Sequence, residues 1–224
     1  MNGEKINAET LSERSHYFDA GVSQKIGGDL TLGLDAYYRK VTNLLDEGQF
    51  GSALIFSPFN YADGKVRGVE LTANYTHDGF TAYANVASSR AEGKDVVTGQ
   101  YNFEQDELDY IATHWVHLDH DQRLTSSGGL SWLWNGTRFG ADYLYGSGLR
   151  ADFANTAHLP QYWQVNASVD HKFTLRQAND LDVGLALINV TDRVYLLRDG
   201  SGIGVGAPQY GPRRGLYFSA NLAF

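Results

Sequence analysis

Apolar and polar residues alternate with a period of two along most of the chain, which is typical of β-strands with two unlike faces. The last segment shows this best. Its apolar phase is Leu216, Phe218, Ala220, Leu222 and Phe224, and its polar phase is Tyr217, Ser219, Asn221 and Ala223. The pattern predicts about nine strands, at 18–26, 30–38, 69–75, 80–86, 130–134, 139–145, 163–169, 181–187 and 216–224. No segment shows a convincing amphipathic helix.

The connections between these strands alternate in length. Short turns are expected at Gly27-Gly28, His77-Asp78-Gly79 and Asn135-Gly136, the last of which favours a type I′ hairpin. A somewhat longer turn is expected at 174–180. Four long segments follow the other strand ends, at roughly 42–64, 91–121, 147–160 and 193–213. Short turns at one end and long loops at the other predict an all-β, antiparallel up-and-down meander.

Hydropathy decides which membrane architectures fit. No stretch has the roughly 18 to 20 apolar residues that a membrane helix requires. The mean hydropathy of −0.35 is ordinary for a soluble protein, yet it also fits a membrane β-barrel, because lipid-facing and lumen-facing residues average out. Periodicity alone leaves open whether the apolar phase points into a soluble core or outward into lipid.

Three features favour the outward, lipid-facing arrangement. The polar phase is rich in Gly, Ser, Thr, Asn, Asp and Tyr, which suits a wet lumen. Aromatic residues of the apolar phase gather near both strand ends, as membrane interfaces select. They are Tyr75, Phe80, Trp132, Trp134 and Phe173 near the short turns, and Tyr38, Tyr143, Tyr145 and Trp163 toward the long loops. The chain ends at Phe224, which we expect to be a signal for the bacterial barrel-assembly machinery.

Charge and cysteine content exclude several functions. The net charge is −8, which argues against binding to nucleic-acid backbones. There are no cysteines, so disulfides, thiolate metal sites and cysteine catalysis are excluded. The first residues show no basic segment followed by an apolar one, so we expect no signal peptide here. Taken literally, the chain is cytoplasmic, or it is a piece of something longer.

The region around the last strand resembles a known family. N-V-T-D-R-V-Y at 189–195, R-D-G-S-G-I-G at 198–204 and P-R-R-G at 212–215 closely resemble the C-terminal end of TonB-dependent outer-membrane receptors. Further similar stretches lie, in matching order, at 13–22, 35–40, 68–71 and 118–123. The resemblance covers nearly the whole chain, and its collinearity is more specific than any single motif.

The resemblance implies a fold, a location and a set of partners. Receptors of this family are 22-stranded barrels of the Gram-negative outer membrane, filled by an N-terminal plug, and they import scarce nutrients such as ferric siderophores with energy relayed by TonB. Residues 1–224 would be the C-terminal barrel part, without plug or signal peptide. Its implied partners are outer-membrane lipid, the assembly machinery, the remaining strands and plug, TonB through that plug, and a small-molecule ligand. No enzymatic activity and no cofactor are expected.

Six residues are the candidates for ligand binding in the loops and lumen: Tyr37, Arg39, Trp115, Tyr210, Arg213 and Arg214. The two neighbouring arginines could attract an anionic ligand, or could bond loop and lumen carboxylates instead. The inward phase would line the lumen with Asp35, Tyr37, Arg39, Glu70, Tyr83, Arg138 and Asp142, whose simpler role is a cross-strand polar network. No catalytic constellation is expected.

Two further clusters call for separate interpretation. The segment 114–121 holds His114, His117, His120, Asp119 and Asp121; we interpret it as a polar loop rather than a metal site, with an adventitious or substrate-borne metal as the alternative. The acidic run from Glu104 to Asp109 favours a solvated surface. Gly200, Gly202, Gly204 and Gly206 lack the spacing and context of a phosphate-binding loop, so a flexible or tightly turned loop is expected.

Two other architectures stay open at this point. A small closed outer-membrane barrel or adhesin of about ten strands would need an extra strand, for example at 53–56 or 194–197, and would pair its first strand with its last. A soluble all-β carbohydrate-binding protein would bury Leu32, Leu34, Leu216, Phe218 and Leu222 in a shared core.

Overall fold

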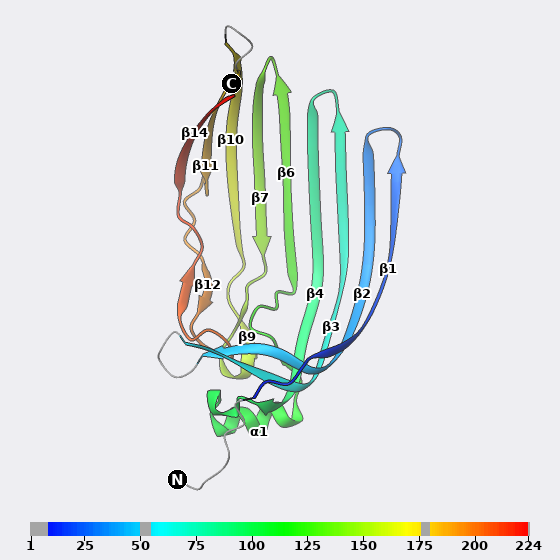
Figure 1. Cartoon of the computed structure of the whole chain (residues 1–224), viewed down its shortest axis with the longest axis vertical. Helices are drawn as coiled ribbons and strands as arrows, with labels where there is room; N and C mark the ends of the chain where they lie inside the picture. The colour runs from blue at the N-terminus through cyan, green and yellow to red at the C-terminus, as the bar shows by residue number, and fades with distance from the viewer. Residues whose placement is uncertain (1–8, 50–54, 176–179, 224) are drawn as a thin grey trace.

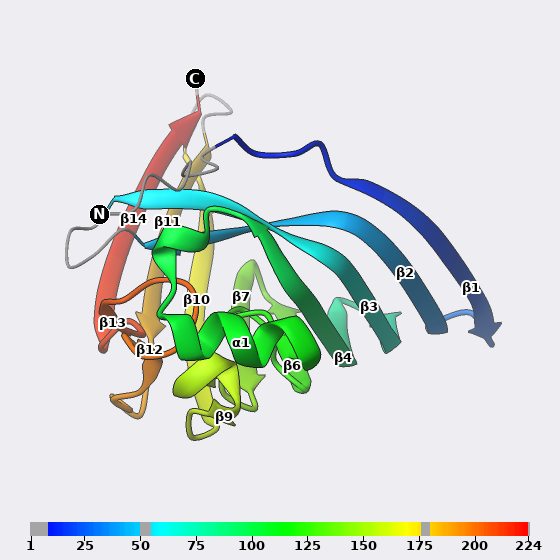
Figure 2. The same cartoon turned by 90° about the horizontal axis from the view of Figure 1, so that it is seen from below.

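Nine strands pair in chain order to form one curved antiparallel sheet in the computed structural model, which describes residues 9–49, 55–175 and 180–223. In spatial order they are β1 (Arg14–Ile26), β2 (Leu30–Gln49), β3 (Phe56–His77), β4 (Phe80–Thr98), β6 (Leu124–Trp134), β7 (Thr137–Gly146), β10 (Tyr162–Thr174), β11 (Asp180–Ile188) and β14 (Gly215–Ala223). Every pairing is antiparallel, and Figures 1 and 2 show the sheet as an open arc. The predicted meander of about nine strands is confirmed.

Shorter elements occupy the ends of the strands opposite the tight turns. β5 (Val116–His117) adds to β4, while β8 (Arg150–Ala151) pairs with β9 (Ala157–His158), and β12 (Leu196–Asp199) with β13 (Pro208–Tyr210). The helices are α1 (Gln105–Thr113) and the 3₁₀ turns η1 (Gln100–Asn102) and η2 (Phe153–Asn155). No helix in the described part of the chain is long and apolar enough to cross a lipid bilayer.

The tight turns have the backbone that their sequences demand. Asn135 and Gly136 have φ values of 47° and 76°, and a type I′ turn requires a positive φ at both central positions. The turn at Asp78 and Gly79 is alike, with φ values of 43° and 78°. These turns lie together at the upper end of the sheet in Figure 1. The predicted turn at 174–180 lies mostly outside the described residues.

The segment 42–64 was predicted as a loop, and that prediction is wrong. β2 continues to Gln49 and β3 starts at Phe56, with their pairing unbroken in register from Leu30↔Tyr75 to Gln49↔Phe56. The buried phase of β2 changes from odd to even positions across Asn43, whose φ is 55°: Val41 is buried before it and Leu44 after it. This change of phase breaks the alternation on which the prediction relied.

The absence of a helix in 91–121 was also predicted wrongly. α1 forms there because Glu104 and Glu107 make a reciprocal capping box at its start. The acidic run is therefore, in part, a helix-start signal. The helix has only nine residues and buries only Ile111, so its apolar periodicity is too weak to detect in the sequence.

The apolar phase of the strands lies on an exposed surface. All five residues that a soluble protein would have to bury are exposed, and Phe218 reaches 72%. Leu71, Leu130, Trp132 and Phe139 are exposed on the same phase. Because no second layer covers them in the described part of the chain, the soluble all-β interpretation is wrong.

The sheet also does not close on itself. β1 and β14 lie at its two edges, and neither pairs with the other. Leu196–Asp199 pairs with β13 in a separate sheet. Of 53–56, residues 53–54 lie outside the described residues and Phe56 begins β3, so neither segment forms an additional strand of the main sheet among the described residues. A small closed barrel is therefore wrong for the described strands.

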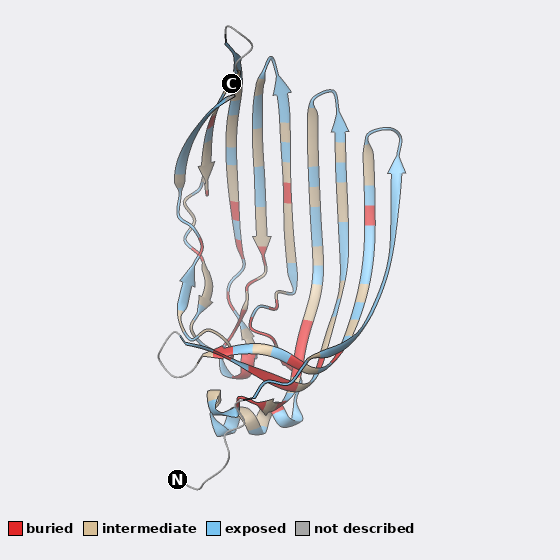
Figure 3. Ribbon diagram, in the orientation of Figure 1, coloured by how far each residue is buried: buried red, intermediate tan, exposed pale blue. Residues whose placement is uncertain are grey.

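Buried hydrophobic residues concentrate in one place, which Figure 3 shows as red at the lower end of the sheet. There the extensions of β2, β3 and β4 bend over and pack against α1, β5 and the segments 147–160 and 193–213. We call the residues 41–49, 55–64, 91–121, 147–160 and 193–213 the loop cap, and the remaining lengths of the nine strands the strand wall. The core cluster is Val41, Leu44, Phe59, Tyr61, Ala91, Val96, Ile111, Val116, Leu118, Ala154 and Ile203.

Candidate functional site

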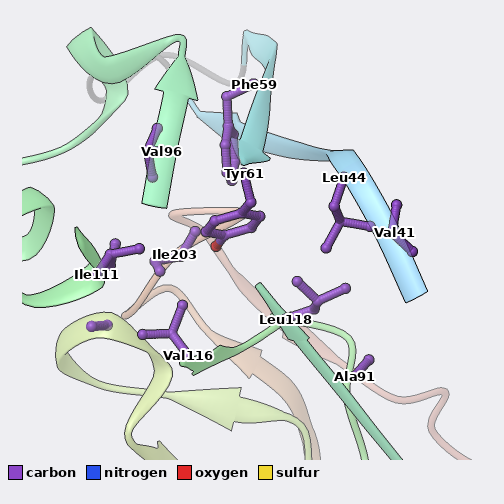
Figure 4. Packing of buried hydrophobic residues seen from close by; sticks show 11 residues of the cluster. Val41, Leu44, Phe59, Tyr61, Ala91, Val96, Ile111, Val116, Leu118 and Ile203 are labelled. Atoms are coloured by element: carbon purple, nitrogen blue, oxygen red, sulfur yellow. The ribbon is translucent and has the colours of Figure 1, made fainter. Parts of the chain in front are cut away.

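The loop cap is held together by aromatic and aliphatic packing between segments far apart in sequence. Phe59 and Tyr61 on β3 meet edge to face at 5.0 Å, and Phe59 meets Phe103 in the same way at 4.8 Å. Figure 4 shows Tyr61 at the centre of the cluster, beside Ile203. Tyr61 and Phe59 are fully buried. A cap with such a core can hold polar groups in fixed positions, as a binding site requires.

The glycine-rich segment 200–206 is a tightly turned loop that packs against this core. Gly200, Gly202 and Gly204 have φ values of 86°, 77° and 117°, where other residues would be strained. The buried side chain of Asn155 fixes the segment: its Oδ1 accepts from the Ile203 N–H at 3.0 Å, and its Nδ2 donates to the His117 carbonyl at 2.9 Å. The tightly turned alternative agrees with this structure.

A polar cleft of about 380 Å³ lies between this loop, β2 and the start of α1. We call it the glycine cleft. It is lined by Gly48, Gln49, Asn102, Phe103, Glu107, Gly200, Gly202, Ile203, Gly204 and Gly206. Both amide atoms of Asn102 are buried and have no hydrogen-bond partner among the described residues. Since buried polar groups are nearly always paired, this amide is suited to bond a molecule that enters the cleft.

A second cleft, of about 440 Å³, is lined by an earlier part of β2 and is called here the acidic cleft. It is lined by Leu45, Asp46, Glu47, Phe56, Pro58, Asp119, His120, Arg198 and Val205. Asp119 accepts from His120 Nδ1 at 2.9 Å and pairs with Arg198 Nη2 at 2.9 Å. The hydrogen bond to Asp119 raises the pKa of His120, and burial raises the pKa of Asp46 to about 6.

Asp121 has a different, structural environment. Arg150 Nη2 lies 2.8 Å from its carboxylate, His117 Nδ1 lies 2.9 Å away, and the Ala91 N–H donates to it at 3.0 Å. Burial alone would raise the pKa of Asp121, but these partners outweigh it and lower the pKa. Asp121 therefore joins β4, β8 and the segment after β5.

Two of the predicted ligand-binding residues, Tyr37 and Arg39, lie on the polar phase of β2. The ring of Tyr37 stacks on Tyr17 at 6.3 Å and covers its cross-strand partner Gly68. Arg39 forms an ion pair with Glu13. Both side chains thus take part in cross-strand contacts, which was the simpler role considered for them.

The other predicted residues lie elsewhere. Arg213 binds both carboxylate oxygens of Asp192, at 2.8 and 2.6 Å, and the Arg214 N–H adds a third bond at 3.0 Å. This holds the pKa of Asp192 well below its usual range. Tyr210 is exposed on β13, and Trp115 lies under the Lys65 ammonium at 3.8 Å.

The structure therefore does not gather the six candidates into one site, because β2 and β14 lie toward opposite edges of the sheet. Their ligand-binding role stays a prediction. The same holds for the assembly signal at Phe224, which lies outside the described residues.

The histidines of 114–120 do not form one cluster either. His114 stacks on Tyr110 at 4.2 Å, His117 pairs with Asp121, and His120 pairs with Asp119.

Sequence reasoning missed two residues that the structure places in clefts, Asp46 and Asn102. Asp46 shares the buried phase of Leu44 and Gly48, which is a detectable signal once the phase change at Asn43 is known.

Comparisons with known proteins agree with this fold. A family profile described as "TonB dependent receptor-like, beta-barrel" matches residues 4–190. A sequence comparison with curated proteins finds no significant match.

Solved structures of similar fold include three transporters or receptors. The unliganded ferric citrate transporter FecA has a TM-score of 0.65 at 19% identity, covering 93% of this chain and 31% of FecA. The siderophore receptor PiuA from Acinetobacter baumannii has a TM-score of 0.66 at 17% identity, covering 97% and 29%. The ferric-catecholate import receptor Fiu from E. coli K12 gives 0.65 at 16%, covering 95% and 28%. The chain spans about a third of the length of these structures. Its sheet, its exposed apolar phase and the match over 4–190 show that the chain belongs to the TonB-dependent receptor-like β-barrel family.

Proposed function

We propose that the chain is part of an outer-membrane receptor for the TonB-dependent uptake of a scarce nutrient, such as a ferric siderophore. The observation that carries the proposal is that the apolar phase of the strands is exposed in a chain that belongs to this family. The apolar phase contacts lipid, and the polar phase lines a lumen. The function is capture and passage of a ligand, not catalysis.

Aromatic belts support this placement in a Gram-negative outer membrane. Trp132 stacks on Trp134 at 6.1 Å and lies 6.3 Å from Phe139, while Tyr75 and Phe80 lie 6.0 Å apart, all near the tight turns. At the other end, Arg193 covers the Trp163 ring at 5.1 Å. Amphipathic rings at two levels suit the two membrane interfaces.

The exposed edges of β1 and β14 indicate the partners that this function needs. Unpaired backbone groups in lipid cost several kcal/mol each, so we propose that further strands complete a barrel of about 22 strands around a plug, which contacts TonB. The barrel-assembly machinery would insert it. The family and the open edges support this proposal.

The glycine cleft is the proposed point of ligand contact in the loop cap. Its size suits a small polar molecule or part of a larger one, and Asn102 offers both a donor and an acceptor. Asn102→Ala removes both. Gln105→Ala is the matched control, since Gln105 lies nearby on α1 but outside the cleft and bonds only to Asp109 in the described structure.

The test is the uptake of radioactive iron, supplied as ferric citrate and as a ferric catecholate, by cells that express the encoding gene. Uptake that requires functional TonB, and that falls at least about fivefold with Asn102→Ala but not with Gln105→Ala, is the expected result. Uptake independent of TonB would contradict the transport proposal. Equal uptake by the two variants would contradict ligand contact in the glycine cleft but would leave the transport proposal intact.

A further inference from the structure

We propose that Asp46, Asp119 and His120 bind a divalent transition-metal cation of the Zn²⁺ class in the acidic cleft. One potential ligand atom from each residue lies within 4.8 Å of the other two. The residues come from two distant segments, β2 and the turn after β5, and they line the same cleft. This site is distinct from the glycine cleft and does not depend on the identity of the transported nutrient.

Asp46 is the observation that points to a bound cation. Its Oδ1 accepts from the Glu47 N–H at 2.9 Å, but its Oδ2 is buried and has no partner among the described residues. A carboxylate oxygen in such a place is costly unless it is paired or coordinates a metal. Because Asp46 lines the acidic cleft beside Asp119 and His120, a cation there would supply the missing partner.

His120 and Asp119 are already arranged as a metal site requires. The contact between His120 Nδ1 and Asp119 Oδ1 holds the imidazole beside the carboxylate with which it would share the cation. The His120 side chain is 59% exposed, whereas that of Asp119 is 11% exposed. The imidazole therefore marks an entry path, and it can move the short distance needed to close the site around a metal with ligand bonds of about 2.0 to 2.2 Å.

The ligand set selects the class of metal. Two carboxylates and one imidazole suit Zn²⁺ and its first-row neighbours, with the remaining positions taken by water. Calcium takes six to eight oxygen ligands and magnesium prefers oxygen and water, so the imidazole disfavours both.

Arg198 makes the proposal sharper, because it occupies Asp119 Oδ2 at 2.9 Å. A cation that uses this oxygen must displace the guanidinium. Removing Arg198 should therefore strengthen metal binding, whereas removing a ligand should weaken it. If Arg198 merely supported the structure of the cap, its removal would weaken metal binding instead.

The experiment titrates the chain, folded in detergent micelles together with the strands that complete its barrel, with Zn²⁺ alone. Calorimetry measures the binding, with Ca²⁺ and Mg²⁺ in parallel. Wild-type protein should bind one Zn²⁺ saturably, with a Kd at least tenfold below that for Ca²⁺. Asp46→Asn and His120→Ala should each raise the Zn²⁺ Kd at least about tenfold, and Arg198→Gln should lower it severalfold.

Matched controls are Asp109→Asn and His158→Ala, which change an acid on α1 and a histidine on β9 outside the cluster. Both should bind Zn²⁺ as wild type does. His120→Ala alters an exposed side chain, so its circular dichroism should equal that of wild type even if Asp46→Asn disturbs packing. The proposal is overturned by a lack of saturable Zn²⁺ binding, by equal affinity for Ca²⁺, or by a His120→Ala variant that binds normally.

Discussion

The strand wall and the loop cap share the strands β2, β3 and β4, yet they place their apolar residues in opposite environments. In the wall, Phe218 and Leu71 are 72% and 54% exposed; in the cap, Phe59 and Tyr61 on β3 are fully buried. β3 takes part in both regions and changes its environment between Tyr61 and Val69. In the proposed membrane arrangement, one strand therefore contacts lipid over one length and packs in a protein core over the other.

The comparison shows that alternation of apolar residues does not by itself indicate where the core is. In the wall the apolar phase is the outer surface, and polar residues such as Thr72 and Asn85 lie on the other face. In the cap, extended strands fold over and bury their apolar side chains against α1 and the loop at Ile203. The following changes test this difference, from the largest expected effect to the smallest.

Replacing a phenylalanine by alanine should destabilise the cap in one region and leave it unchanged in the other. Phe59→Ala opens a cavity between Tyr61 and Phe103, so the cap should lose about 3–5 kcal/mol of stability. Phe218→Ala removes a ring that faces outward and should leave the cap unchanged. Amide hydrogen exchange of 44–49 and 56–61 measures both. Equal effects of the two variants would break the distinction between wall and cap.

A charge tests the lipid-facing surface of the wall. Leu71→Arg places a cation on the apolar phase near the middle of the wall and should cost about 2–4 kcal/mol in lipid. Glu70→Arg places the same group one residue earlier, on the polar phase, and should cost far less. The measurement is the equilibrium fraction of the completed barrel that is folded in lipid vesicles. Similar costs at 70 and 71 would contradict a one-sided wall.

The wall was predictable from sequence, and most of the cap was not. Period-two alternation and turns such as Asn135-Gly136 are local signals, so the strands and their order followed from them. The cap depends on contacts between distant segments, such as Asn155 with Ile203 and Asp46 beside Asp119. Its local signals were also weak: α1 is short, and the phase change at Asn43 concealed the length of β2 and β3. Resemblance to a family indicated the fold of nearly the whole chain, but it could not predict the positions of these side chains.

The junction between the two regions should depend on Asn189. Its buried side chain donates to the Arg193 and Pro212 carbonyls at 2.9 and 2.8 Å, just after β11 ends, and its φ is 49°. Asn189→Ala should destabilise the junction by about 1–3 kcal/mol, because buried carbonyls lose their donor. Exchange at Arg193 and Gly215 reports the change. Asn221→Ala, in an exposed position on β14, is the control and should have no such effect.

The smallest effect is expected at the exposed pair of Asp192 and Arg213. Arg213 lowers the pKa of Asp192, so the contribution of this pair is present above the usual aspartate range and is lost as pH falls below it. The NMR shift of the Arg214 amide, which donates to Asp192, should titrate with a midpoint well below 3.8. Asp192→Asn should abolish that titration and leave the loop cap unchanged. A midpoint at the ordinary aspartate value would show that the pair does not form.

The central claim is that one face of the strand wall contacts lipid and the other contacts water, and single-cysteine spin labelling tests it most directly. The chain has no cysteine, so a label can be placed in turn at each position from 69 to 74. In the completed barrel reconstituted in lipid vesicles, labels at Val69, Leu71 and Ala73 should be accessible to lipid-soluble oxygen. Labels at Glu70, Thr72 and Asn74 should be accessible to a water-soluble nickel reagent. Accessibility without this alternation, or with its phase reversed, would contradict the account.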